Sequence, residues 1–251
     1  MQDLFDIRGR VALITGANRG IGKAIALGFA QAGADIAIVS SKYSPETVAE
    51  IEQLGVRCQA WKYDLSDCGG LAGLVGEIAG SMGTIDILVN NAGTQRRYPC
   101  VDFPQDEWDT VMNINAKAVF YLCQAAGRLM IARGYGKIIN MASMMSFQGG
   151  LTIPAYAGSK GAVTQFTKTL ANEWAAKGVN VNCIAPGYFL TDMNAALVSD
   201  PVRSSQIMAR LPAGRWGEPA DIVGAALFLA SHASDYVHGI VIPVDGGWLA
   251  R

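Results

Sequence analysis

A tyrosine and a lysine stand four positions apart in the stretch PAYAGSK, residues 154–160. If this stretch is helical, Tyr156 and Lys160 lie on one face of the helix. A free phenol has a pKa of about 10, and a nearby ammonium group would lower that pKa toward neutrality. The phenol could then exchange a proton with an alcohol or a carbonyl oxygen. Such pairs also occur by chance on solvated helix faces. Other residues must therefore show whether this pair is catalytic or accidental.

A serine at the end of an apolar stretch supports the chemical interpretation. The segment GKIINMAS, residues 136–143, has the pattern of a buried strand and ends in Ser143, thirteen positions before Tyr156. Its hydroxyl could hold the same substrate oxygen as the phenol. Two hydroxyls on one oxygen need no metal ion, and none is expected. The two histidines, His232 and His238, lie far along the chain, and structural roles are expected for both.

Glycines after the first apolar stretch predict a phosphate-binding turn. The segment VALIT, residues 11–15, is followed by Gly16, Gly20 and Gly22 and then by a helix-like segment. Glycines allow a sharp turn whose backbone N–H groups, with the helix N-terminus, stabilise a pyrophosphate. The spacing G-x-x-x-G-x-G differs from the usual G-x-G-x-x-G, and a purely structural turn is the alternative. The order of strand, glycines and helix favours a turn that binds the pyrophosphate of a cofactor over a purely structural turn.

The segments that carry these residues alternate between strand-like and helix-like patterns. Short apolar runs separated by amphipathic segments are typical of βα units around a parallel sheet. We therefore predict one α/β domain over residues 1–251, with a doubly wound (Rossmann-type) seven-stranded parallel sheet and helices on both faces. Residues 187–217 have no clear pattern and are predicted to form a substrate lid. The predicted strands are 11–15, 35–40, 57–64, 85–90, 136–143, 179–186 and 239–246, and the predicted helices are 20–32, 45–54, 67–82, 105–132, 155–177 and 218–231.

Composition argues against several classes of function. Hydrophobic residues make up 51% of the chain and charged residues 16%, which suits a sheet buried on both faces. The net charge is -1 without a basic cluster, so neither nucleic acid nor an anionic membrane is an expected partner. The sequence has no membrane-length apolar run, no signal-peptide pattern and no cysteine spacing typical of metal sites or disulfides. We expect a cytoplasmic protein.

Taken in order, the motifs resemble the short-chain dehydrogenase/reductase family along nearly the whole chain. That family combines a T-G-x-x-x-G-x-G turn, an N-N-A-G turn, a catalytic Asn, Ser and Y-x-x-x-K set, and a P-G pair with a nearby Thr. The resemblance implies a nicotinamide-dependent oxidoreductase that acts on a CH–OH group. The matching positions are Thr15 to Gly22, Asn90 to Gly93, Asn115, Ser143, Tyr156, Lys160, Pro186, Gly187 and Thr191.

The resemblance also implies roles for individual residues. Tyr156 would be the general acid/base, Ser143 would polarise the reacting oxygen, and Lys160 would lower the phenol pKa and bind the nicotinamide ribose. Asn115 would hold a water molecule that links Lys160 to solvent. Asp64 would meet the adenine amino group, with a helix cap or turn as the alternative. The predicted cofactor contacts are Gly16, Asn18, Arg19, Gly20, Ile21, Gly22, Ser40, Lys42, Asp64, Leu65, Asn91, Ala92, Gly93, Tyr156, Lys160, Pro186, Gly187, Phe189 and, for the carboxamide, Thr191.

The residues alone leave the choice between NAD and NADP open. NAD-dependent enzymes often end the second strand with an acid that binds the ribose 2′-OH, whereas Ser40 stands here. The missing acid and the charge of Lys42 favour NADP, although Lys42 could equally be a solvated loop residue. The segments NNAGTQRR, LPAGRWGEPADI and VDGGWLAR resemble the sugar-acid branch of the family, which generally uses NAD and also lacks that acid. The resemblance therefore implies NAD, with NADP as the alternative.

The same branch implies a small sugar acid as substrate, of the 2-dehydro-3-deoxy-gluconate or 2-deoxy-gluconate type. Two consecutive arginines follow the N-N-A-G turn and could bind its carboxylate in a two-point fork. An ion pair within the protein or between subunits is the alternative for each arginine. The predicted substrate contacts are Arg96, Arg97, Ser143, Met145, Gln148, Tyr156 and Tyr188.

Other functions share the residues named so far. A 3-oxoacyl-thioester (acyl carrier protein) reductase, or another carbonyl reductase, has the same catalytic set and differs in its pocket. A dinucleotide-binding sensor or scaffold would need no turnover, but all four catalytic positions are filled. The apolar segment VIPVDGGWLA near the C-terminus resembles the one through which relatives form tetramers, and a homotetramer is expected.

Overall fold

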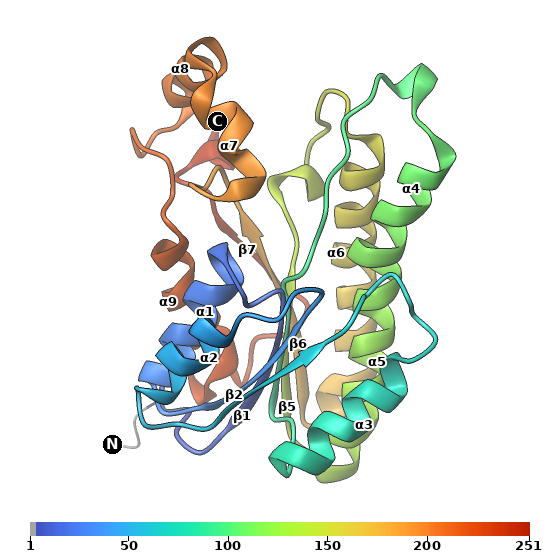
Figure 1. Cartoon of the computed structure of the whole chain (residues 1–251), viewed down its shortest axis with the longest axis vertical. Helices are drawn as coiled ribbons and strands as arrows, with labels where there is room; N and C mark the ends of the chain where they lie inside the picture. The colour runs from blue at the N-terminus through green and yellow to red at the C-terminus, as the bar shows by residue number, and fades with distance from the viewer. Residues whose placement is uncertain (1–3) are drawn as a thin grey trace.

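The sheet at the centre of the molecule has seven strands, all parallel. The computed structural model describes residues 4–251, and Figure 1 shows the sheet between two layers of helices. The strand order is β3-β2-β1-β4-β5-β6-β7. Strands β2 and β3 are added on one side of β1, and β4 to β7 on the other, so the order in which strands are added reverses between β1 and β4. Ligands of open parallel sheets bind at such a reversal, outside the carboxyl ends of the strands. The strands are β1 (Val11–Thr15), β2 (Asp35–Ser40), β3 (Cys58–Lys62), β4 (Ile87–Asn90), β5 (Gly136–Met141), β6 (Val179–Pro186) and β7 (Val241–Val244).

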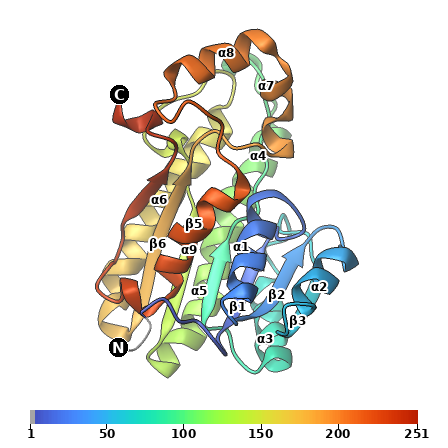
Figure 2. The same ribbon diagram turned by 90° about the vertical axis from the view of Figure 1, so that its left-hand side faces the viewer.

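Helices cover both faces of the sheet because both faces are apolar. Neighbouring strand residues such as Leu13 and Ile14 point to opposite faces and belong to two separate core clusters. Helices α3, α5 and α6 pack on the first face, and α1, α2 and α9 on the second (Figures 1 and 2). The predicted fold class is thereby confirmed. These helices are α1 (Gly20–Gln31), α2 (Pro45–Glu52), α3 (Leu71–Met82), α5 (Ala118–Arg133), α6 (Pro154–Trp174) and α9 (Val223–Ala230).

The predicted helix over residues 105–132 is interrupted. It consists of α4 (Gln105–Met112), a π-helical turn (Asn113–Lys117) and α5. A π-helical turn places one extra residue in the helix and often marks a functional region. Predicted strands 57–64, 136–143 and 239–246 extend one or two residues beyond β3, β5 and β7, although single backbone hydrogen bonds, such as Ala142 N–H to the Ile184 carbonyl at 2.8 Å, continue past the strand ends.

The segment 187–217 contains two short helices, α7 (Ala195–Ser199) and α8 (Pro201–Arg210). Asp200 begins α8 by accepting from the backbone N–H groups of Val202 and Arg203 at 2.9 and 3.0 Å. Both helices lie beyond the carboxyl ends of β6 and β7 (Figures 1 and 2). Over residues 4–251, no helix combines the length and apolar character that a membrane crossing requires.

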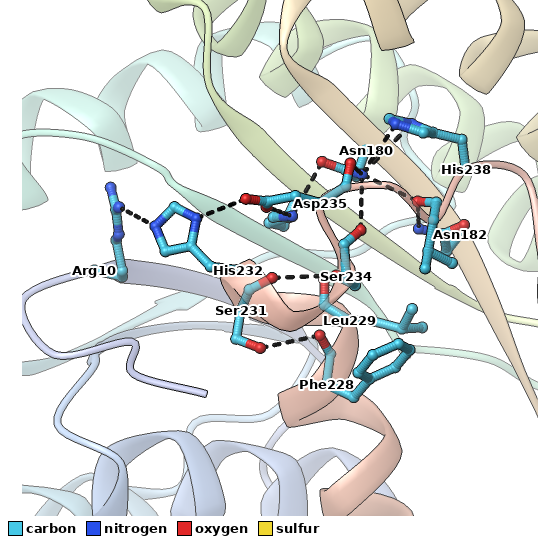
Figure 3. Close-up of polar contacts among 12 residues, drawn as sticks. Arg10, Asn180, Asn182, Phe228, Leu229, Ser231, His232, Ser234, Asp235 and His238 are labelled. Carbon is cyan, nitrogen blue, oxygen red and sulfur yellow. Dashed lines mark hydrogen bonds and ion pairs between the residues drawn. The ribbon is translucent and has the colours of Figure 1, made fainter. Parts of the chain in front are cut away.

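A polar cluster lies at the opposite ends of β5 and β6, near their first residues (Figure 3). Lys137 is 1% exposed and donates to Asp235 at 2.6 Å and to Asn180 at 3.0 Å. Burial raises the carboxyl pKa of Asp235, but hydrogen bonds with Lys137 and His232 outweigh burial and leave the pKa below its usual value. His232 Nδ1 lies 2.9 Å from Asp235, and a ring nitrogen of His238 lies 3.4 Å from the Asn180 amide. Both histidines therefore join contacts between secondary-structure elements, away from the ligand-binding edge.

Candidate active site

A cavity of about 1140 Å³ lies over the carboxyl ends of the strands and collects most of the predicted site residues. Its walls come from the loops after β1, β2, β3, β4, β5 and β6, on both sides of the reversal in strand order. Every predicted cofactor or substrate contact lines this cavity except Arg96. Of the four predicted catalytic residues, Ser143, Tyr156 and Lys160 line it and Asn115 does not.

The glycine turn after β1 is packed too closely for side chains. A Cβ on Gly22 would overlap the carbonyl oxygen of Gly16 and the side-chain amide of Asn91. A Cβ on Gly16 would lie 3.0 Å from the Cα of Ala92. Thr15 joins this turn to the N-N-A-G turn, because its Oγ1 accepts from the backbone N–H groups of Asn91 and Ala92 at 3.0 Å each. Together the turn after β1 and the N-N-A-G turn form one packed surface at the base of the cavity, which we call the glycine floor.

This floor fits the pyrophosphate of a dinucleotide. Gly20 has a φ of +55°, a conformation that favours glycine, and begins α1 at the cavity wall. The first turn of α1 contains no acidic residue, so the positive end of the helix is available to an anion. Arg19, directly before Gly20, also lines the cavity and pairs with Asp192 at 2.7 Å, with both side chains exposed.

The ends of β2 and β3 form the wall farther along the cavity. Ser40 donates to the backbone carbonyl of Lys42 at 2.6 Å, and both residues line the cavity. Asp64 accepts from the backbone N–H and the hydroxyl of Ser66 at 2.9 and 2.8 Å, and these hydrogen bonds lower its carboxyl pKa. The turn role considered for Asp64 is therefore present, and Asp64 also lines the cavity beside Leu65.

Ser143, Tyr156 and Lys160 converge in the cavity from two elements. Ser143 follows β5 and is buried. Because α6 begins at Pro154, Tyr156 and Lys160 lie about one helical turn apart. Lys160 Nζ lies 5.8 Å from the centroid of the Tyr156 ring and donates to the carbonyl of Met141 at 2.6 Å. Ser143 lies close enough to the phenol to lower its pKa, and both predicted oxygen-binding residues line the same cavity.

The pKa of Tyr156 is raised, which corrects the prediction that Lys160 would lower it. Burial raises the phenol pKa, and the hydrogen bond with Ser143 opposes this only in part. Burial also lowers the pKa of Lys160 to about 8. Lys160 thus loses its charge at a lower pH than that at which the phenol ionises. At neutral pH, Tyr156 keeps its proton and Lys160 keeps its charge.

Asn115 lies behind the cavity wall. It is fully buried in the π-helical turn, and its Oδ1 accepts from the backbone N–H of Thr94 at 2.8 Å. Its Nδ2 donates to the Thr94 carbonyl at 2.8 Å and to Ser159 Oγ at 3.2 Å. Both polar atoms of the side chain therefore have protein partners, and Lys160 is not one of them. These contacts do not support the water-holding role; they fix Thr94, which lines the cavity.

The two consecutive arginines have different partners. Arg96 Nε donates to Glu107 at 2.6 Å, and its Nη1 donates to Thr94 Oγ1 at 2.8 Å. This is the ion pair considered as the alternative, and it corrects the prediction that Arg96 binds substrate. Arg97 is exposed and lines the cavity. With its amide oxygen toward Arg97, Gln95 accepts from Nε and Nη2 at 2.9 and 2.7 Å.

The segment 187–217 adds cavity residues that the sequence analysis missed. Arg203, Gln206 and Arg210 of α8 line the cavity. The signal that could have revealed α8 is Asp200 followed by Pro201, because Asp at a helix cap and Pro at the first helical position mark a helix start. The predicted substrate contacts found in the cavity wall are Arg97, Ser143, Met145, Gln148, Tyr156 and Tyr188.

Known proteins resemble the chain over almost its full length. Residues 16–249 match the family model described as enoyl-(acyl carrier protein) reductase. The 2-dehydro-3-deoxy-D-gluconate 5-dehydrogenase of Dickeya dadantii is 50% identical over 248 residues, which are 98% of each chain. A gluconate 5-dehydrogenase from Burkholderia cenocepacia, solved in complex with NADP and tartrate, has a TM-score of 0.96 and 43% identity, covering 99% of this chain and 98% of that one. A structure from Agrobacterium tumefaciens with bound NADP, provisionally named a 2-deoxy-D-gluconate 3-dehydrogenase, has a TM-score of 0.94 and 48% identity over 100% of both chains.

These matches agree with the motifs and with the geometry. They confirm the resemblance drawn from the ordered motifs, including its sugar-acid branch, and the expectation of a nicotinamide cofactor. The cavity supplies what that chemistry needs: a glycine floor for the pyrophosphate, and two hydroxyls and an ammonium group at its centre. The chain belongs to the short-chain dehydrogenase/reductase family and is an oxidoreductase acting on CH–OH groups.

Proposed function

We propose that the protein is an NADP(H)-dependent dehydrogenase that interconverts a secondary alcohol and a ketone on a small sugar acid of the gluconate type. The charge of the substrate side of the cavity carries this proposal. Arg97, Arg203 and Arg210 line the cavity together with Ser143. A guanidinium group matches the geometry of a carboxylate, and the names of the relatives from Dickeya and Burkholderia refer to sugar acids.

The acids of the cavity wall do not cancel these charges. Among the described residues, the wall contains two carboxylates, those of Asp64 and Asp192. Asp64 belongs to the wall near the end of β3 and accepts from Ser66. Asp192 pairs with Arg19. The three arginines on the substrate side therefore favour an anionic substrate.

Ser143 and Tyr156 act on the reacting oxygen in this proposal. In reduction, Tyr156 donates its proton to the carbonyl oxygen, and Ser143 stabilises the charge that develops there. In oxidation, the same phenol oxygen takes the proton from the alcohol. The bound nicotinamide supplies or accepts the hydride at the carbon. The position of both hydroxyls in the cavity wall, and the effect of Ser143 on the phenol pKa, support this shared role.

The remaining predicted residues hold the cofactor and shape the site. Lys160, charged at neutral pH and oriented by the carbonyl of Met141, binds the nicotinamide ribose. The glycine floor receives the pyrophosphate, and Thr191, at the start of the lid segment, meets the carboxamide. Asn115 acts as a positioning residue that holds Thr94 against α6 through Ser159. The lid is residues 187–217, whose helices cover the substrate side.

The proposal replaces the expected preference for NAD with one for NADP. The end of β2 carries Ser40 and no acid that would bind a 2′-OH or repel a 2′-phosphate. Lys42 lines the cavity as a cation, and so does Arg19, which is paired with Asp192. The structures from Agrobacterium and Burkholderia were solved with NADP, and none of these three observations favours NAD.

A substrate panel tests this function. Initial rates should be measured with 2-dehydro-3-deoxy-D-gluconate, 5-keto-D-gluconate, a 3-oxoacyl thioester and a simple ketone, each with NADPH and NADH. We expect the highest kcat/KM for a keto sugar acid with NADPH, because the arginines attract the carboxylate and the cations attract the 2′-phosphate.

The panel also tests the alternatives. A higher kcat/KM for the 3-oxoacyl thioester than for any keto sugar acid would favour the 3-oxoacyl-thioester (acyl carrier protein) reductase. Higher activity with NADH than with NADPH would restore the preference for NAD. Cofactor binding without turnover of any substrate would favour a sensor or scaffold.

The assembly we propose is a cytoplasmic homotetramer. Within residues 4–251, strand β7 is hydrogen-bonded to β6 only, so its other edge presents backbone groups that this part of the chain does not pair. Helix α9 beside it is built of apolar and small residues, and Ile240 before β7 is 45% exposed. Light scattering should give about four times the chain mass of 26.6 kDa. A monomer at micromolar concentration would contradict the proposal.

A further inference from the structure

One face of α8 is turned toward the cavity. Arg203, Gln206, Ile207 and Arg210 all line it, and their spacing of three and four residues places them on one side of a helix. Ile207 is buried and belongs to a cluster with Met144. Because Met144 directly follows Ser143, this packing holds the face of α8 near the centre where the reacting oxygen is bound.

Arg203 and Arg210 have no carboxylate partner within residues 4–251. Arg203 Nη1 donates to Gln206 at 3.2 Å. Asp200, the acid closest to Arg203 in sequence, is occupied in capping the backbone at the start of α8. By contrast, Arg96 and Arg215 each form an ion pair at 2.6 Å. Two guanidinium groups thus face the cavity without a neutralising acid, where a ligand carboxylate can bind them.

The guanidinium group of Arg210 stacks on a tryptophan ring. Its guanidinium carbon lies 4.0 Å from the centroid of the Trp248 ring. Trp248 is 6% exposed, and its ring packs edge-on against Tyr188 at 4.8 Å. Stacking uses the face of a guanidinium group and leaves the N–H groups at its edge free to bind a carboxylate. Tyr188 lies two residues after the end of β6, so the sheet itself supports this arrangement.

We propose that Arg203 and Arg210 bind the substrate carboxylate, so that selectivity for an acid comes from the lid helix. The inference rests on the proposed sugar-acid function and deepens it. Arg97 comes from the loop before α4, and α4 and α8 lie on opposite sides of the molecule (Figure 1). The substrate acid group therefore binds on the lid side, at a distance from the oxygen that Ser143 and Tyr156 hold.

The test compares an acid with its neutral analogue. Arg203→Gln, Arg210→Gln and the double variant should be assayed with NADPH on 5-keto-D-gluconate and on its carboxamide. Each single change should raise KM for the acid about tenfold, because a charge-assisted contact is lost, and should leave kcat/KM for the carboxamide nearly unchanged. Arg210→Lys should recover part of the loss, since it keeps the charge but not the fork. Arg128→Gln is the matched control, because Arg128 is exposed on α5 and contacts Gln124.

The outcomes separate this inference from the proposed function. Equal losses on the acid and the carboxamide, or a matching rise in KM for NADPH, would assign the arginines to lid structure or cofactor binding and overturn the inference. Unchanged KM for the acid in the double variant would overturn it as well. If the wild-type protein prefers a neutral ketone or an acyl thioester to every keto acid, the proposed function itself fails, whatever the variants do.

Discussion

Replacing Tyr156 with phenylalanine should lower kcat by about 10²- to 10⁴-fold, the range that a positioned acid or base contributes. The change removes one oxygen and keeps the ring, so the start of α6 and the cavity wall are preserved. Binding of NADPH, followed by its fluorescence, should remain close to wild type because the glycine floor is a separate element. The rate should be measured with a keto sugar acid and saturating NADPH.

The pH profile distinguishes loss of the acid/base from distortion of the site. Because burial raises the pKa of Tyr156, the phenol is protonated at neutral pH and loses its proton only as the pH rises through that pKa. Wild-type alcohol oxidation should therefore increase with pH in the alkaline range, as the phenolate base accumulates. The Tyr156→Phe variant should lack this rise. A variant that retained the rise, or more than about a tenth of the wild-type kcat, would show that another group transfers the proton.

Substituting Gly22 with alanine should weaken NADPH binding by about 10- to 100-fold and destabilise the fold by about 1–3 kcal/mol, the cost of an extra methyl group in a packed site. The added Cβ would overlap the carbonyl oxygen of Gly16 and the amide of Asn91. To relieve this overlap, the turn after β1 and the N-N-A-G turn must both move away from the pyrophosphate position. Fluorescence titration gives the dissociation constant, and urea unfolding gives the stability.

Gly76→Ala provides the matched control. Gly76 is exposed in the middle of α3, and a Cβ there would have no neighbour within 4 Å among the described residues, 4–251. Alanine should stabilise this helix by about 0.5–1 kcal/mol and leave NADPH binding unchanged. If Gly22→Ala bound NADPH as tightly as Gly76→Ala, the turn after β1 would not be the pyrophosphate site.

The fold was predictable because its signals are local. Seven apolar runs, separated by amphipathic segments, correspond to the seven strands, and β1, β2 and β6 have the predicted limits. The π-helical turn at Asn113–Lys117 escaped prediction because no proline or glycine marks it. The contacts made from this turn are also distant in sequence: the Asn115 side chain binds Thr94 and Ser159, which are 21 and 44 residues away.

The residues of the candidate site were predictable where motif residues directly follow strands. The ion-pair partners of charged residues and the burial of their side chains were not. Ser143, Tyr156 and the glycine turn line one cavity because parallel strands end at one edge. The sequence could not show that Arg96 meets Glu107, because that contact depends on the fold of the loop before α4. It also could not show that Lys160 lies deep enough for burial to lower its pKa. Burial depth depends on the whole tertiary structure.

The packing of the turn after β1 against the N-N-A-G turn separates a part of the cofactor site that tolerates few substitutions from a part that can be redesigned. Gly16, Gly22, Thr15 and Asn91 fit one another so tightly that a change at one position requires changes at the others. They should therefore tolerate redesign poorly and act as a fixed module. The loop from Ser40 to Lys42, closed by its own hydrogen bond at 2.6 Å, lies outside that module. The preference for NAD or NADP can be redesigned in this loop while the glycine floor keeps its shape.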